Sequence, residues 1–267
     1  IESGEATGPN ILSNSCLDVS AETEDSCIVG DESLPRTAVV VGDSVAVSWM
    51  PGLGAALNDL GYRVRMLTHS QCPFADVSVS GAFEAGARRA GYPEACNDHR
   101  SWARDRIQQI KPDLVVAADG EVEMQTLILP DGKDAKQYWT EGMVSASNGL
   151  GAIPLVVLTS PPQSASISDC YTRVSTVKDC TDRVTTQWRE QTAATDKANG
   201  TVAQRFGMID VRGWYCSPDG WCPPFVDNIV VRADRQHVAE PYARRLQPVL
   251  VEALRDTIAS LPGVVAP

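Results

Sequence analysis

Short apolar runs alternate with longer amphipathic segments along the chain. Five runs rich in Val, Leu and Ile predict buried strands, at residues 37–42, 62–69, 112–119, 153–162 and 206–212. Helical spacing predicts helices at residues 44–61, 100–111, 134–150, 183–200 and 238–259, the first interrupted near Pro51-Gly52. Because strand and helix alternate and the strands are continuously apolar, we expect an α/β fold. Its parallel five-stranded sheet should be covered by helices on both faces.

The segments outside this pattern are polar. Residues 1–36 are acidic and loop-like, so we predict an N-terminal extension there and one α/β domain over residues 37–267. Two long loops are expected, at 70–98 and 163–182. The sequence starts without Met or a signal-peptide pattern, and we expect a mature or excised segment. No window reaches the roughly 18 uninterrupted apolar residues that a membrane span needs.

The charge balance is acidic. Asp and Glu number 34 against 23 Lys and Arg, which gives a formal net charge of -11. Proteins that bind nucleic acid rely on Lys and Arg to neutralise phosphates, so this balance argues against a nucleic-acid partner. We expect the acidic surface only to keep the protein soluble.

Eight cysteines in loop-like surroundings indicate disulfides and an oxidising compartment. When the cysteines are taken as successive pairs along the chain, each pair brackets a stretch rich in Pro, Gly, Ser or Asp. We therefore predict that they pair in this order. The predicted pairs are Cys16–Cys27, Cys72–Cys96, Cys170–Cys180 and Cys216–Cys222. Free buried thiols are the alternative. No CxxC motif is present and the chain has three His, so we expect no zinc site, other metal or cofactor.

The first predicted strand ends abruptly in Gly42-Asp43-Ser44. Ligands of parallel sheets bind beyond the carboxyl ends of the strands, so Ser44 is placed as a candidate nucleophile. The alternative is structural, because Asp and Ser are both common caps at the start of a helix.

A serine nucleophile needs a base, usually His. His69 follows the second strand and His99 is expected near a helix start, as a satisfied polar residue. His237 alone has a carboxylate at a suitable spacing, because Asp234 lies three residues earlier. On a turn, this Asp can accept the Nδ1 proton and leave Nε2 free to take a proton from serine. The alternative is a surface Asp–His pair that caps the last helix.

A strand-end GDS followed much later by D-x-x-H resembles the SGNH/GDSL hydrolase superfamily. The resemblance implies that Ser44 is the nucleophile, His237 the general base and acid, and Asp234 the orienting carboxylate. It implies a flavodoxin-like three-layer α/β/α sandwich, the SGNH hydrolase fold, with the catalytic domain over residues 37–267. The reaction it implies proceeds through an acyl-serine intermediate.

More of the chain resembles one branch, the extracytoplasmic SGNH domain fused to membrane acyltransferases of family 3. The shared features are "CIVGDESLPRTAVVVGDS", "CP" after the second strand, "KPDLVVAA" and "YARRL" after the D-x-x-H. This resemblance implies a serine-dependent O-acyltransferase or esterase that acts on acetyl or short acyl esters of cell-envelope glycans or glycolipids. It also implies a periplasmic or cell-surface location and tethering to an upstream transmembrane acyltransferase domain absent from this chain.

The chain departs from the superfamily at two blocks that supply oxyanion donors. "THSQCP" follows the second strand without the expected Gly, and "ADGEVE" follows the third without the Asn of G-x-N-D. The branch usually has His after GDS, where this chain has Val45. We expect backbone N–H groups of Ser44, Ser70 and Gln71 to serve instead. The departures leave two alternatives open, a non-catalytic glycan-binding module and a free secreted GDSL esterase or lipase.

Two further groups of residues are open to interpretation. The acidic residues after the third strand are expected to form a solvated loop rather than a cation site; they are Asp119, Glu121 and Glu123. Aromatic residues surround the last cysteine pair and either stack on a sugar or pack against the disulfide; they are Trp214, Tyr215 and Trp221.

Overall fold

The computed structural model describes residues 16–82, 89–202 and 204–262. Its centre is a six-stranded sheet in the order β1-β3-β2-β4-β5-β7. Five of these strands are parallel and confirm the predicted sheet: β2 (Arg36–Gly42), β3 (Tyr62–Thr68), β4 (Leu114–Ala118), β5 (Leu155–Leu158) and β7 (Phe206–Ile209). Across the sheet they run second, first, third, fourth, fifth, which is the flavodoxin-like order.

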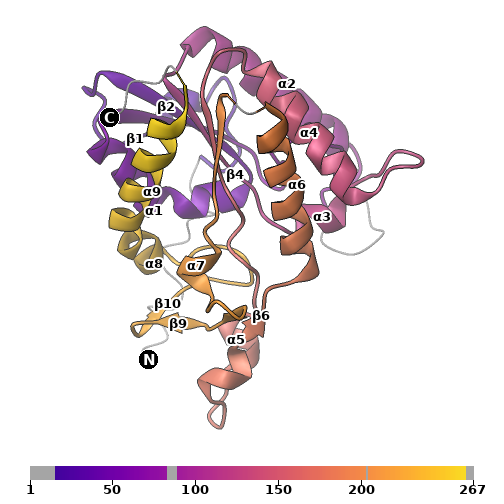
Figure 1. Cartoon of the computed structure of the whole chain (residues 1–267), viewed down its shortest axis with the longest axis vertical. Coiled ribbons are helices and arrows are strands. Elements are labelled where there is room, and N and C mark those ends of the chain that lie inside the picture. The colour runs from indigo at the N-terminus through magenta and orange to yellow at the C-terminus, as the bar shows by residue number, and fades with distance from the viewer. Residues whose placement is uncertain (1–15, 83–88, 203, 263–267) are drawn as a thin grey trace.

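Helices cover both faces of the sheet (Figure 1). One layer holds α1 (Ser44–Asp59), α8 (Glu240–Arg245) and α9 (Gln247–Ser260), and the other holds α2 (Tyr92–Ile110), α4 (Ala135–Gly149) and α6 (Thr186–Val202). Short helices are α3 (Glu123–Thr126), α5 (Ile167–Cys170) and α7 (Arg212–Tyr215). None of the helices in the described ranges is long and apolar enough to span a bilayer.

Helix α1 is continuous, whereas a break near Pro51-Gly52 was expected. Proline inside a helix costs one backbone hydrogen bond, so packing must hold the two halves in line. Gly52 supplies that packing, because a Cβ placed there would lie 1.9 Å from the Ala243 carbonyl oxygen. The close approach of α8 thus needs glycine, and the residue that looked like a helix breaker is a contact point.

Other boundaries also differ from expectation. Helix α2 begins at Tyr92 rather than near residue 100, so Cys96 lies in the helix and not in the loop before it. The expected loop over 163–182 contains α5 and a 3-10 turn, Val177–Cys180. The last predicted helix is divided into α8 and α9, and α9 has Pro248 in its first turn, where proline is tolerated.

The described part of the N-terminal segment joins the sheet. Strand β1 (Ile28–Val29) pairs antiparallel with β3, and the Val19 amide donates to the Thr68 carbonyl at 2.9 Å. Residues 1–15 lie outside the described ranges, and the boundary at residue 36 stays a prediction.

Four disulfides fasten the chain in the predicted pairing. They are Cys16–Cys27, Cys72–Cys96, Cys170–Cys180 and Cys216–Cys222. Two of them close loops after β5 and β7, beyond the carboxyl edge of the sheet. There β6 (Asp182–Arg183) pairs with β8 (Trp221–Cys222), and β9 (Phe225–Val226) pairs with β10 (Ile229–Val230). These small elements gather at one end of the molecule, near α5 and α7 (Figure 1).

Candidate active site

The turn between β2 and α1 gives Asp43 and Ser44 different roles. Asp43 is the residue before the helix, and its Oδ1 accepts the Val45 amide at 2.7 Å. Its Oδ2 accepts the Gly120 amide at 2.7 Å, which ties the ends of β2 and β4 together. Ser44 begins α1, where no helix carbonyl can accept its N–H. Asp43 is therefore the cap, and the Ser44 hydroxyl is left for another partner.

That partner is His237, 193 residues later in the chain. Its Nε2 lies 2.7 Å from Ser44 Oγ, and its Nδ1 lies 2.6 Å from Asp234 Oδ2. An ionised carboxylate only accepts hydrogen bonds, so Nδ1 carries the proton and Nε2 is the acceptor that faces the hydroxyl. Ser44 and His237 are 7% and 9% exposed, which leaves a small opening to the serine.

The Asp234 carboxylate is held in place by its own turn. Its Oδ1 accepts the amides of Gln236 and His237, each at 2.9 Å. Partial burial by itself raises the pKa of Asp234, but the bond from the His237 ring and these amides outweigh burial and lower it to about 2. The carboxylate is thus ionised at neutral pH and can orient the imidazole.

Two further contacts anchor the loop that carries this pair. Ser48 Oγ, on the second turn of α1, accepts the Val238 amide at 3.1 Å. Arg232 is buried, donates from Nε to the Pro162 carbonyl at 2.7 Å, and lies over the Tyr215 ring at 5.3 Å. The loop is therefore fixed on one side to the helix of the serine and on the other to the turn after β5. Neither contact has a signal in the local sequence.

The expected oxyanion donors differ in availability. The Ser70 amide donates to Asp18 Oδ1 at 2.8 Å, so its hydrogen is already used. Gln71 has a φ of 58° in the tight turn His69–Cys72. Gly120 lies two residues after the end of β4, and Gln236 Oε1 lies 3.4 Å from where a Cβ at position 120 would be. Because glycine has no side chain, space is left at position 120, and Gln236, the neighbour of His237, borders it.

The other two histidines lie apart from this triad. His69 Nδ1 lies 3.1 Å from Asp18 Oδ1, so the chain contains a second Asp–His pair. The His69 ring stacks on His99 with centroids 4.7 Å apart. His99 lies within α2 rather than near its start, and burial lowers its pKa to about 4. A neutral stacked ring is a structural residue, as the sequence suggested for His99.

Comparison with protein families now bears on this geometry. Residues 15–252 match the family described as the SGNH domain fused to AT3 domains. The chain belongs to this family. No curated protein matches the chain. Four disulfides are those of a domain that folds outside the cytoplasm, and an extracytoplasmic location fits the family.

A solved structure shares the fold of this SGNH domain. The periplasmic domain of a lipopolysaccharide acetyltransferase from Salmonella ser. Paratyphi A is 13% identical, with a TM-score of 0.64, and the match covers 93% of each chain. A lipase/acylhydrolase from Enterococcus faecalis is also 13% identical, with a TM-score of 0.46, over 81% of this chain and 94% of the other.

The acidic residues after β4 are buried in this SGNH domain, so the expected solvated loop is wrong. Asp119 is 5% exposed, Glu121 0% and Glu123 1%. The Phe74 amide donates to Asp119 at 2.9 Å, and the Thr126 hydroxyl donates to Glu123 at 2.9 Å. Burial, together with the nearby charge of Asp43, raises the pKa of Asp119 and Glu123 well above their ordinary values.

Glu121 is buried on the other side of the site, toward the loop of Arg232. It accepts the Thr185 hydroxyl at 2.7 Å, and its Oε2 has no hydrogen-bond partner within the described ranges. The two terminal nitrogens of Arg232 are equally without partners there. Burial raises the pKa of Glu121 to about 7, against the opposing effects of the Thr185 bond, the Gln163 amide and the Arg232 charge.

The pKa of Glu121 predicts a pH-dependent stability. Between pH 4.5, its ordinary pKa, and about 7, folded Glu121 keeps a proton that the unfolded chain has released. Stability therefore falls as the pH rises through this range. Glu121→Gln should reduce the loss of unfolding free energy between about pH 5 and pH 8 by about 2.5 kcal/mol. Urea unfolding at a series of pH values measures it, with exposed Glu141→Gln as the control. An unchanged slope would contradict the prediction.

The aromatic residues near the last disulfide divide into two groups. Trp214 and Tyr215 pack edge-on against Trp49, with centroids 6.1 Å and 6.0 Å apart; Tyr215 belongs to the core and the half-buried Trp214 packs against it. Trp221 is 41% exposed, and the Arg183 guanidinium lies 4.5 Å from its ring centroid. Trp221 is thus the one of the three with an open face.

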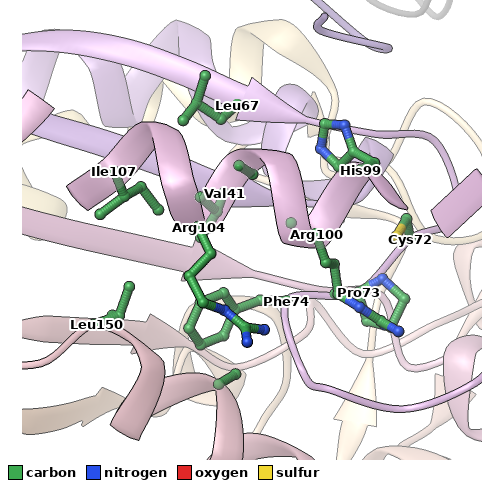
Figure 2. Close-up of a pocket in the computed structure, with 13 residues that line it drawn as sticks. Val41, Leu67, Cys72, Pro73, Phe74, His99, Arg100, Arg104, Ile107 and Leu150 are labelled. Atoms are coloured by element: carbon green, nitrogen blue, oxygen red, sulfur yellow. The ribbon is translucent and has the colours of Figure 1, made fainter. Parts of the chain in front are cut away.

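A small cavity lies between the ends of β2 and β3 and helix α2 (Figure 2). Arg100 and Arg104 point from α2 toward the chain at Pro73 and Phe74, and Arg100 donates to the Ala75 carbonyl at 2.8 Å. The cavity measures about 30 Å³, room for a water and not for a substrate. The arginines at this cavity therefore hold the loop that follows β3.

Proposed function

We propose that Ser44 is the nucleophile of an O-acyltransferase or carboxylic ester hydrolase, with His237 as base and Asp234 as its orienting carboxylate. The observation that carries the proposal is the 2.7 Å contact between His237 Nε2 and Ser44 Oγ, completed by the 2.6 Å contact to Asp234. The site lies at the carboxyl ends of β2 and β4, the neighbouring strands between which the strand order reverses. Ligands of such sheets bind at this switch point.

The reaction follows from the direction of these contacts. Ser44 Oγ attacks the carbonyl carbon of an acyl donor while His237 Nε2 takes its proton. The proton then passes to the leaving group, and the acyl group remains on Ser44 as an ester. A sugar hydroxyl or water attacks this ester in the second half, with His237 again as base. The Ser44 amide, unused by the helix, is the first oxyanion donor that we propose, and the Gln71 amide is the second.

Substrates and partners are proposed from the family. An SGNH domain of this kind is fused to AT3 domains, and the similar Salmonella structure is the periplasmic domain of a lipopolysaccharide acetyltransferase. We propose that this chain transfers acetyl or short acyl groups to cell-envelope glycans or glycolipids, tethered to a membrane acyltransferase domain. The four disulfides support an extracytoplasmic site of action.

A non-catalytic glycan-binding module is the second candidate. It is favoured by the segment after β4, which lacks the Asn that would donate to an oxyanion, and by the occupied Ser70 amide. Such a module would bind sugar without forming a covalent intermediate.

Acylation of Ser44 separates the two candidates. The chain is incubated with p-nitrophenyl acetate, quenched in acid and digested, and the mass of the peptide with Ser44 is measured. We expect an acetyl adduct on Ser44 and labelling of the same serine by a fluorophosphonate probe. An unlabelled Ser44 in folded protein, together with no release of p-nitrophenol above the buffer rate, contradicts the catalytic proposal.

A further inference from the structure

A polar pocket of about 390 Å³ adjoins the loop of Asp234 and His237. Arg235, between these two residues, lines the pocket, and its carbonyl accepts the Ser164 amide at 3.1 Å. Gln163 also lines the pocket, and its Nε2 donates to Gln236 Oε1 at 3.3 Å. The pocket therefore shares a wall with the loop that positions the base.

The pocket lining suits a ligand with many hydroxyl groups. It offers carboxylates, guanidinium groups and hydroxyls from Asp169, Asp182, Arg183, Arg235, Ser166 and Thr185. Carboxylates accept and guanidinium groups donate, so hydroxyls, which do both, can pair with either kind of group. Ala165 contributes the apolar side chain of the lining, which is too little to hold an acyl chain.

An exposed aromatic ring stands beside this polar lining. The β6–β8 pairing sets Arg183 opposite Trp221, and the Arg183 guanidinium lies 4.5 Å from the Trp221 ring centroid. Trp221 is 41% exposed although it is large and apolar. Sugar rings present an apolar C–H face and polar edges, and an indole next to guanidinium and carboxylate groups offers both kinds of contact.

Two disulfides and a strand pairing constrain the walls of the pocket. Cys170–Cys180 closes the loop that begins directly after Asp169, and Cys216–Cys222 closes the loop that contains Trp221. The pairing of Asp182 with Cys222 joins the two segments. A preformed polar site loses less conformational entropy on binding than a flexible loop does.

We propose that this pocket binds the acceptor, a sugar residue whose hydroxyl takes the acyl group from Ser44; the inference rests on the function proposed above. The hydroxyl oxygen attacks the carbonyl carbon of acyl-Ser44, and His237 Nε2 takes the hydroxyl proton. The bond between the acyl carbon and Ser44 Oγ breaks as the new ester forms. His237 returns the proton to Ser44 Oγ, which regenerates the free serine.

Sugar binding is tested without catalysis in the Ser44→Ala protein. Methyl glycosides of glucose, galactose, mannose and rhamnose are titrated to tens of millimolar while the indole N–H signals are followed by NMR. We expect at least one glycoside to shift the Trp221 signal, assigned with Trp221→Phe, and Arg183→Ala to weaken this binding at least about tenfold. Inorganic phosphate is the parallel probe. No glycoside response, or a Trp221 response to phosphate alone, overturns the proposal.

Acyl transfer provides the second readout. With p-nitrophenyl acetate as donor and the responding glycoside as acceptor, acetylated sugar and free acetate are both measured. We expect Asp169→Asn and Arg183→Ala to lower the ratio of transferred to hydrolysed acetyl at least about tenfold. The control is Lys136→Ala, in the larger pocket of about 790 Å³ between α4 and α6. An unchanged ratio in both pocket variants overturns the acceptor pocket. If the wild-type protein neither hydrolyses p-nitrophenyl acetate nor transfers its acetyl group, the proposed function is overturned instead. Sugar binding is then judged by the titration alone.

Discussion

Replacing Ser44 with alanine is expected to lower the turnover of p-nitrophenyl acetate by about 10⁴-fold or more. The variant lacks the oxygen that lies 2.7 Å from His237 Nε2, so no acyl-enzyme can form. What remains is the slow attack of water in a site that still holds the base and the oxyanion donors. The comparison is made on initial rates of p-nitrophenol release, with the acetyl-Ser44 peptide as a second measurement.

The fold should tolerate this change, so a lower rate can be assigned to the loss of the hydroxyl and not to unfolding. Asp43, not Ser44, accepts the Val45 amide and caps α1, so the helix start is retained. Within the described residues the hydroxyl makes one hydrogen bond, to His237, and its loss is expected to cost about 1 kcal/mol of stability. Ser101→Ala, on the exposed face of α2, is the matched control and should leave the rate unchanged. A folded Ser44→Ala protein as fast as Ser101→Ala would rule out Ser44 as the nucleophile.

The sheet was predictable because its strands are buried on both faces. All five residues of β4, Leu114–Ala118, are buried, and such a strand reads as a continuous apolar run in the sequence. Strand β1 has two half-buried residues, Ile28 and Val29, and no periodicity can reveal so short an edge strand. The parallel sheet therefore followed from the sequence, whereas its antiparallel edge needed the structure.

The contact between Asp234 and His237 was predictable for a different reason. Asp234 and His237 are three residues apart, so their contact is local and its spacing is visible. The contact between Asp18 and His69 joins residues that lie far apart in the sequence, and it depends on how the N-terminal segment lies along the end of β3. The spacing in the sequence therefore identified one Asp–His pair, whereas the described part of the chain contains a second one. Of these two pairs, Asp234–His237 is the one whose ring nitrogen contacts Ser44 Oγ.

The burial of the acidic residues could not be read from their types. Carboxylates are normally solvated, and "ADGEVE" reads as a polar loop. In the fold, Asp119 accepts a backbone amide and Glu121 accepts the Thr185 hydroxyl from beyond β5, so partners distant in sequence make the burial tolerable. The elevated pKa values then reduce the charge that must be buried. The segment after β4 that departs from the superfamily is thus part of the buried structure next to the turn that carries Ser44.

Replacing Asp234 with asparagine is expected to lower kcat by about 10⁴-fold with the fold intact. Asp234 uses Oδ1 for the amides of Gln236 and His237 and Oδ2 for the His237 ring. Asparagine has one oxygen, which stays with the two amides and preserves the turn. Its NH₂ group then faces Nδ1, which can pair with it only as an acceptor. The neutral imidazole is consequently protonated at Nε2, and a nitrogen that carries a proton cannot take one from Ser44.

The Asp234 carboxylate should be available to orient the His237 ring at every pH at which activity can be measured. The pKa of Asp234 is about 2, so the wild-type carboxylate is ionised across the range in which activity can be measured. The rates of both proteins are compared from about pH 5 to pH 9, and the proton on the His237 ring is located by nitrogen chemical shifts in NMR. Asp227→Asn is the control, because Asp227 is an exposed residue paired with Arg245. A loss of tenfold or less, with the ring still protonated at Nδ1, would show that Asp234 does not set the tautomer. A loss of about 10⁴-fold with the proton moved to Nε2 would show that activity depends on the direction of the two hydrogen bonds of the His237 ring, to Asp234 and to Ser44.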